Sequence, residues 1–96
     1  MHAAALRLEI RIPGVHSLKE KRGRIKALSA MLTETFPVAV SEVDHQNQWQ
    51  RATLGVALVS GGAGHLEKVI HSVQRALLDH PDVELIEMGV SYLEES

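Results

Sequence analysis

The residues best suited to bind a ligand form a basic run near the N-terminus. Five of the eight residues from Lys19 to Lys26 are cationic. They occupy the first turns of a predicted helix, where the helix dipole is positive and favours acidic side chains instead. On a helical wheel Lys19, Arg22 and Lys26 share one flank. Arg24 lies on the other flank, and a basic stripe of this kind fits phosphate groups. A solvated helix face is the alternative interpretation.

A second concentration of polar side chains fills the connector of residues 44–50, which contains the only tryptophan of the chain. Trp49 is suited to stack on a base or to contact a protein partner. The alternative is that Trp49 folds back as a lid on the edge of the core. The candidate nucleic-acid-binding residues are Lys19, Arg22, Arg24, Lys26, Trp49 and Arg51.

Lys21 differs from the other cations, because it falls on the apolar side of the predicted helix. It follows Leu18 by three residues and precedes Ile25 by four. A buried ammonium must reach solvent along its stem or find a carboxylate. We therefore expect Lys21 to pair with Glu42 or Asp44, or with carbonyl groups of the connector. Such a pair would lock the helix to the connector.

Other chemistries lack the residues that they require. The chain has no cysteine, which excludes disulfides, thiolate nucleophiles and thiolate metal sites. Its six histidines include no pair at the spacing of a helical zinc site. Asp44 and His45 resemble an orienting acid and a base, but no serine or cysteine nucleophile is placed beside them. We expect no enzyme, no metal and no cofactor.

Hydrophobic periodicity predicts six elements that position these residues. Residues 4–12, 38–43, 52–60 and 83–92 read as strands, the last with a bulge or bend between Leu85 and Ile86. Residues 17–35 form a helix with Ser17 and Glu20 as a capping box, and Pro37 closes it. A glycine turn at Gly61–Gly64 precedes a second helix, whose apolar stripe runs over 66–77. The order βαββαβ indicates an α+β, ferredoxin-like fold. Its antiparallel sheet has strand order 4-1-3-2, with both helices on one face.

Length and composition bound the kind of protein. The chain has 96 residues, of which 45% are hydrophobic, and this predicts a single domain over residues 1–96. There is no basic-then-apolar leader and no apolar run near the roughly 20 residues that span a bilayer. We expect a cytoplasmic protein without a membrane partner. No motif for reading a DNA sequence is present.

Two stretches resemble those of the YlxP-like family of small bacterial proteins, a domain of unknown function. The first is Ser17-Leu18-Lys19-Glu20-Lys21-Arg22. The second is Glu42-Val43-Asp44-His45-Gln46, followed by Trp49-Gln50-Arg51-Ala52-Thr53. The resemblance spans nearly the whole chain and implies a ferredoxin-like fold in a bacterial cytoplasm. The family's genes often lie beside translation and ribosome-maturation genes, which implies a role near RNA or the ribosome. It implies no catalytic residue.

Two functions from different classes follow. The first is a non-catalytic binding protein that associates with RNA or the ribosome and contacts phosphates through the basic helix start. RNA-recognition sheets of this topology carry aromatic residues on strands 1 and 3, whereas these positions here hold residues such as Arg7, Glu9 and Gly55. RNA would therefore bind at the helix rather than on the sheet. The alternative is a homodimerising regulatory or interaction module, because small residues such as Ala5 and Ala57 would let a second sheet approach.

Overall fold

Strand β1 (His2–Arg11) lies at the centre of the fold and separates its two faces. In the computed structural model, which describes residues 1–95, the even-numbered residues from Ala4 to Ile10 are buried beneath the helices. The odd-numbered residues point to the other face and are exposed or half-buried. This is the alternation that a strand with one buried face produces. Ser96, the last residue of the predicted domain, lies outside the described residues.

Helix α1 (Leu18–Thr35) begins one residue after the predicted start and ends at the predicted residue. Its N-cap is Ser17, whose hydroxyl accepts a hydrogen bond from the backbone N–H of Glu20 at 3.1 Å. The Glu20 carboxylate in turn accepts from the backbone N–H of His16 at 2.9 Å, one residue before the position that the capping box predicts. The helix ends before Phe36 and Pro37. Neither α1 nor the second helix, α2 (Ala63–Leu78), has the length and apolar character needed to cross a membrane.

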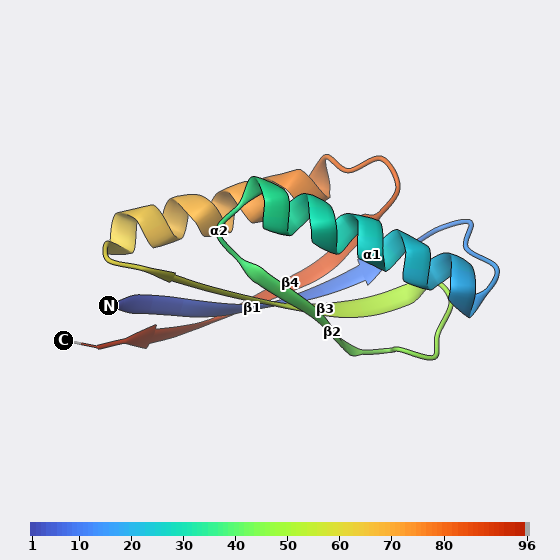
Figure 1. Cartoon of the computed structure of the whole chain (residues 1–96), viewed down its shortest axis with the longest axis horizontal. Helices are drawn as coiled ribbons and strands as arrows, with labels where there is room; N and C mark the ends of the chain where they lie inside the picture. The colour runs from blue at the N-terminus through green and yellow to red at the C-terminus, as the bar shows by residue number, and fades with distance from the viewer. Residues whose placement is uncertain (96) are drawn as a thin grey trace.

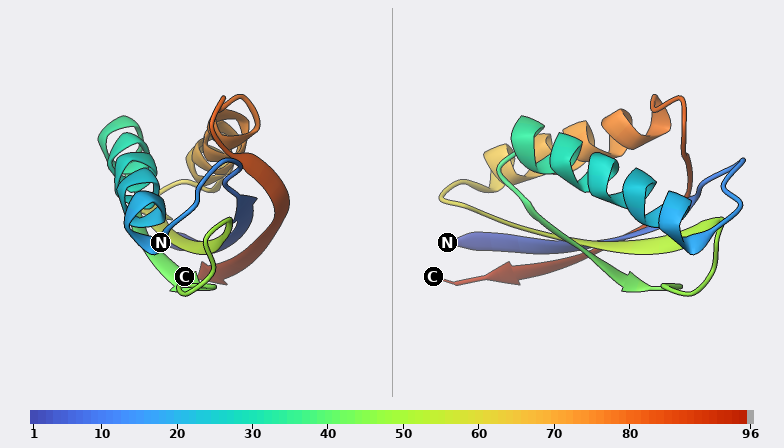
Figure 2. Two further views of the ribbon diagram at one scale, coloured as in Figure 1. Left: turned by 90° about the vertical axis from the view of Figure 1, so that its right-hand side faces the viewer. Right: turned by 45° about the vertical axis from the view of Figure 1, so that its right-hand side comes forward.

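The sheet has the predicted topology. Its strand order is β2-β3-β1-β4 and all three pairings are antiparallel, which is the order 4-1-3-2 counted from the opposite edge. The remaining strands are β2 (Ala39–Asp44), β3 (Arg51–Ser60) and β4 (Glu84–Glu94). Both helices lie on one face of the sheet (Figure 1), and the end-on view in Figure 2 shows the other face uncovered by any element. We call this uncovered side the open face. The ferredoxin-like α+β arrangement is confirmed.

Element boundaries differ from the predicted ones where pairing extends beyond the sequence signal. β1 begins at His2 and β4 continues to Glu94, because these two residues are register partners. Helix α2 begins at Ala63, inside the predicted glycine turn, and Gly64 lies in its first turn. A glycine is tolerated there because the N–H groups of a first turn have no partner within the helix.

Two β-bulges shape the sheet. Glu9 pairs with Glu87 and Ile10 with Leu85, so that Ile86 is skipped, where the sequence predicts a bulge or bend. The second bulge, in β2, has no sequence signal, and it skips Val43 between Glu42 and Asp44. In a regular strand residues 42 and 44 would point the same way. The bulge instead leaves Glu42 on the helix side and turns Asp44 to the open face.

The core between the helices and the sheet is aliphatic, and the chain has only one Phe, one Trp and one Tyr. Its central members include Leu8, Leu54 and Leu77, all with no exposed surface. Among residues 1–95, Lys21 and Thr53 are the only buried residues that are polar or charged. The sandwich measures 47 × 22 × 20 Å, and its long axis separates the glycine turn from the end that carries the connector and the start of α1.

Candidate functional site

The connector between β2 and β3 is held by three hydrogen bonds, two to the loop between β1 and α1 and one to the first turn of α1. The backbone N–H of Ile12 donates to the carbonyl of Gln50 at 2.9 Å. The side-chain amide of Gln50 donates to the carbonyl of Val15 at 3.1 Å. The third donor is Lys21, whose ammonium donates to the carbonyl of His45. The connector and the helix start therefore form one surface at this end of the domain, as the right-hand view of Figure 2 shows.

Lys21 is the buried charge of this surface. Only 1% of its side chain is exposed, and its Nζ lies 2.8 Å from Oε2 of Glu42, which is itself 18% exposed. A buried ammonium is tolerated when a carboxylate and further acceptors surround it. The structure thus brings Lys21 together with Glu42 and with a connector carbonyl. Asp44, the other acid expected near Lys21, does not take part, because the bulge at Val43 turns it to the opposite face.

Asp44 instead fixes the first turn of the connector. Its Oδ1 accepts the backbone N–H of His45 at 2.8 Å, and its Oδ2 lies 3.5 Å from Nη2 of Arg7. The hydrogen bond from the His45 backbone N–H lowers the pKa of the Asp44 carboxyl below its ordinary value, and the nearby His45 side chain and the Arg7 guanidinium act in the same direction. His45 has a φ of 59°. This left-handed conformation reverses the chain and accompanies the inward direction of the His45 carbonyl.

Glu9 ties the connector to the open face. Its carboxylate is 15% exposed and lies 3.2 Å from Nε of Arg7 and 3.6 Å from Nε2 of His45. It also accepts a hydrogen bond from the buried hydroxyl of Thr53 at 2.8 Å. The alternation of β1 predicts that Glu9 faces outward but does not predict this network. The signal that would have found it is the β1–β3 register, which places Glu9 directly opposite Thr53.

The four remaining cations of α1 are exposed. None of them has a carboxylate within 4.0 Å among residues 1–95; they are Lys19, Arg22, Arg24 and Lys26. Arg24 stands apart from the other three, because it lines a small hollow of about 100 Å³ with His80 and Asp82. Trp49 keeps 52% of its surface exposed at the same end of the domain. It therefore does not form the closed lid considered in the sequence analysis.

Arg51 is not brought together with these cations. The alternation of β3 places its side chain on the open face, whereas α1 covers the other face. Its Nη2 lies 4.0 Å from Oε2 of Glu9, at the edge of an ion pair. The sequence grouping of Arg51 with the basic helix start is therefore corrected. Arg51 is close to Trp49 in sequence, but its side chain lies on the face of the sheet opposite to α1.

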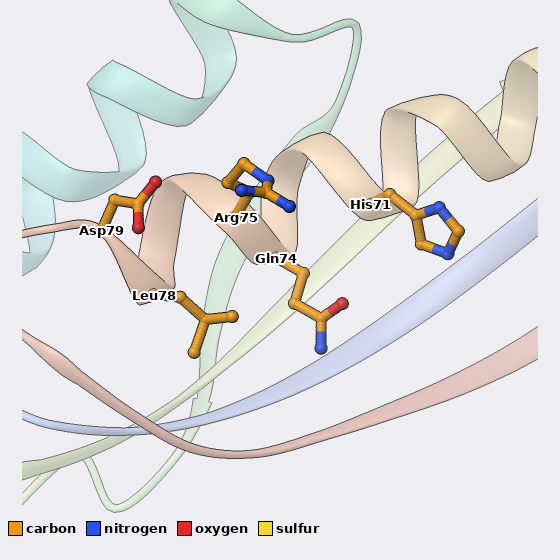
Figure 3. Close-up of a pocket in the computed structure, with 5 residues that line it drawn as sticks. All are labelled: His71, Gln74, Arg75, Leu78 and Asp79. Carbon is orange, nitrogen blue, oxygen red and sulfur yellow. The ribbon is translucent and has the colours of Figure 1, made fainter.

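A hollow along α2 does not gather groups that could perform chemistry. It measures about 350 Å³ and is lined by His71, Gln74, Arg75, Leu78 and Asp79. These residues all belong to α2 or its C-cap, and Figure 3 shows them spread along the helix rather than pointing toward one another. Within residues 1–95 no group of three or more histidine, aspartate or glutamate side chains is arranged to hold a metal ion.

Comparison with known proteins places the chain beside proteins without an assigned activity. Residues 3–90 match the model of the family described as protein of unknown function DUF503. The uncharacterised protein YlxP of Bacillus subtilis (strain 168) is 35% identical over 68 residues, which cover 71% of this chain and 74% of the relative. The resemblance that the two sequence motifs indicate is thereby confirmed.

Proposed function

We propose, for a chain that belongs to the DUF503 family of proteins of unknown function, a non-catalytic role in binding RNA or the ribosome. Phosphate groups of the RNA would contact the basic residues at the start of α1. The observation that carries this proposal is the set of exposed α1 cations that have no carboxylate partner within residues 1–95. A cation that is already paired within the protein contributes little to phosphate binding. An unpaired cation neutralises a phosphate and releases the counterions of the nucleic acid, which favours binding.

The placement of these cations suits an extended polyanion. Lys19, Arg22 and Lys26 lie along one flank of the first two to three turns and span about 10 Å, at a rise of about 1.5 Å per residue. The N-terminal end of a helix adds positive potential of its own. Lys21 holds this end of α1 rigidly against the connector, so that the cations extend from a fixed base.

Trp49 adds a surface for an unpaired base. About half of the surface of Trp49 is exposed, and three exposed residues with amide side chains precede it, Gln46, Asn47 and Gln48. An aromatic ring stacks on any base, and amides can pair with base edges. Single-stranded or looped RNA therefore fits this surface better than a continuous duplex. The open face carries no aromatic side chain on β1 or β3 for a base to stack on.

Charge reversal tests the proposal directly. In the double variant Arg22→Glu/Lys26→Glu, we expect affinity for ribosomes or single-stranded RNA at low salt to fall by about tenfold or more. The slope of log K against log salt should shrink by about 1.4, or about 0.7 for each lost phosphate contact. Fluorescence anisotropy with labelled RNA and co-sedimentation with ribosomes measure both.

The matched control is Lys68→Glu/Arg75→Glu, which makes the same change of charge at two exposed positions of α2 with the same mix of residue types. This variant should bind as the unaltered protein does, apart from the small effect of net charge. Binding that is unchanged in the α1 variant, or equally weakened in both, contradicts a site on α1.

A second function, self-association, is favoured by a different observation. The open face is hollowed beside β2 by about 290 Å³, and the lining is almost entirely apolar, with Ala5, Val43, Gly55 and Ala57 among its members. Val59, on the same face, is 64% exposed. Small side chains would let a second copy of this sheet pack at the usual sheet-to-sheet distance of about 10 Å.

Sedimentation velocity over a range of protein concentrations tests self-association. We expect a dimer that Ala57→Glu abolishes, because the substitution buries an unpaired carboxylate in the proposed contact. Ser72→Glu, on the exposed side of α2, serves as control and should leave the dimer intact. A protein that remains monomeric at the highest concentration would rule this function out.

A further inference from the structure

Two arginines face each other at the connector end of the open face. Arg11 of β1 and Arg51 of β3 are direct register partners, and their side chains are 57% and 43% exposed. Like charges directly opposite each other in an antiparallel pair destabilise the sheet. Glu84 of β4, the register partner of Arg11 on its other side, and Glu9 of β1 are the carboxylates nearest to this pair.

The carboxylates of the protein balance this pair only weakly. Nη1 of Arg11 lies 3.7 Å from Oε2 of Glu84, and Nη2 of Arg51 lies 4.0 Å from Oε2 of Glu9. Charge-assisted hydrogen bonds are shorter, at about 2.7–2.9 Å. The Glu9 carboxylate is moreover shared with Arg7, whose Nε is closer at 3.2 Å.

The guanidinium groups also keep their hydrogen-bonding capacity. Among residues 1–95 neither the guanidinium group of Arg11 nor that of Arg51 donates a hydrogen bond, and Nε of Arg51 is buried without an acceptor. Each guanidinium carries five N–H groups in a planar fork that matches the oxygens of carboxylates and phosphates. These N–H groups favour an oxyanion that can accept from both side chains.

Space for such a ligand lies between the two side chains. A hollow of about 400 Å³ is lined by Arg11, Gln50, Arg51 and Ile86. The skipped residue Ile86 supplies an apolar wall, and Gln50 is fixed by its hydrogen bond to Val15. The hollow is thus lined by two guanidinium groups, one apolar side chain and one glutamine held by a hydrogen bond.

We propose that Arg11 and Arg51 form a binding site for a phosphate group, separate from the α1 cations and on the opposite face of the sheet. The phosphate oxygens would accept from the terminal N–H groups of both forks. A phosphodiester of an RNA strand and the phosphate of a small compound share this chemistry. The site does not depend on RNA binding at α1, since either source of phosphate satisfies it.

Nuclear magnetic resonance of the arginine Nε–Hε groups tests the site. Inorganic phosphate is titrated into labelled protein against sodium chloride at matched ionic strength. We expect saturable shifts of the Arg11 and Arg51 signals and no comparable shift of Arg75, an exposed arginine on α2. Arg11→Gln and Arg51→Lys should each weaken phosphate binding by about tenfold, because each removes one fork. Shifts that are equal for all arginines, or that chloride reproduces, overturn the proposal.

A variant that is expected to bind phosphate more tightly provides an independent test, because loss of folding cannot produce tighter binding. Glu84 is 59% exposed and competes with the ligand for Arg11. Glu84→Gln should therefore tighten phosphate binding by about threefold or more. Unchanged or weaker binding in this variant contradicts the site.

The two sources of phosphate are separated with dimethyl phosphate and single-stranded RNA as further probes. If Arg51→Lys weakens RNA and dimethyl phosphate together with inorganic phosphate, the site serves an RNA backbone. If it weakens inorganic phosphate alone, the site serves a compound with a terminal phosphate. Because inorganic phosphate is tested without RNA, failure of the α1 charge reversal leaves this result intact.

Discussion

Lys21→Ala is expected to lower the free energy of unfolding by about 3 kcal/mol. The substitution removes an ammonium that is 1% exposed and leaves Glu42, 2.8 Å away, as a largely buried carboxylate without its partner. It also deprives the His45 carbonyl of its donor, so that the connector loses one of its three anchors. Urea denaturation followed by circular dichroism measures the change. Faster amide hydrogen exchange in the connector should accompany it.

Two neighbours on the same helix provide the controls. Lys19→Ala and Lys26→Ala should each cost less than about 0.5 kcal/mol, because both side chains are exposed. The double variant Lys21→Met/Glu42→Leu should recover most of the loss, since apolar residues of similar volume replace buried ion pairs at little cost. Equal losses for all three lysine variants would show that the Lys21 pair does not stabilise the protein.

Leu54→Ala should also cost about 3 kcal/mol, from the lost transfer free energy and the cavity left behind. Leu54 has no exposed surface and lies on the helix side of β3. Five residues along the same strand, Val59 points to the open face and is 64% exposed. Val59→Ala should cost less than about 0.5 kcal/mol. Denaturation midpoints of the two variants at low protein concentration measure this difference between the faces.

The stability losses of the same two variants can also be compared at several protein concentrations. If the open face packs against a second copy, the cost of Val59→Ala should grow as concentration rises, because stability of a dimer depends on concentration. The cost of Leu54→Ala should remain large at every concentration. A small cost for Leu54→Ala would contradict the sidedness of the sheet.

Local patterns predicted most of the fold. The alternation from Leu6 to Ile12 marks one strand, and Ser17 with Pro37 delimits a helix, because these signals act within a few residues of the chain. The helical period also places Lys21 on the buried side of α1. The element order then leaves few topologies to choose from. Each of these inferences uses interactions that are short in sequence.

The side of the sheet on which a residue lies could not be predicted where long-range pairing decides it. The bulge at Val43 comes from the register with β3 and separates Glu42 from Asp44 onto opposite faces. The same kind of register pairs Arg11 with Arg51, forty residues apart in the chain. A one-residue slip reverses every side chain that follows. The exposure of Trp49 depends in the same way on how the connector is anchored, which local sequence does not encode.

The Lys21 contact with the connector uses a backbone oxygen of His45 rather than its side chain. The anchor therefore survives changes of side chain at the tip, provided that the residue at position 45 tolerates a positive φ, as asparagine and glycine do. Residues 46–48 are exposed and free of this constraint. A loop that is fixed at its base and variable at its tip can acquire new specificity without loss of the scaffold. The connector is thus the segment at which a sequence library or a grafted recognition peptide would be best tolerated.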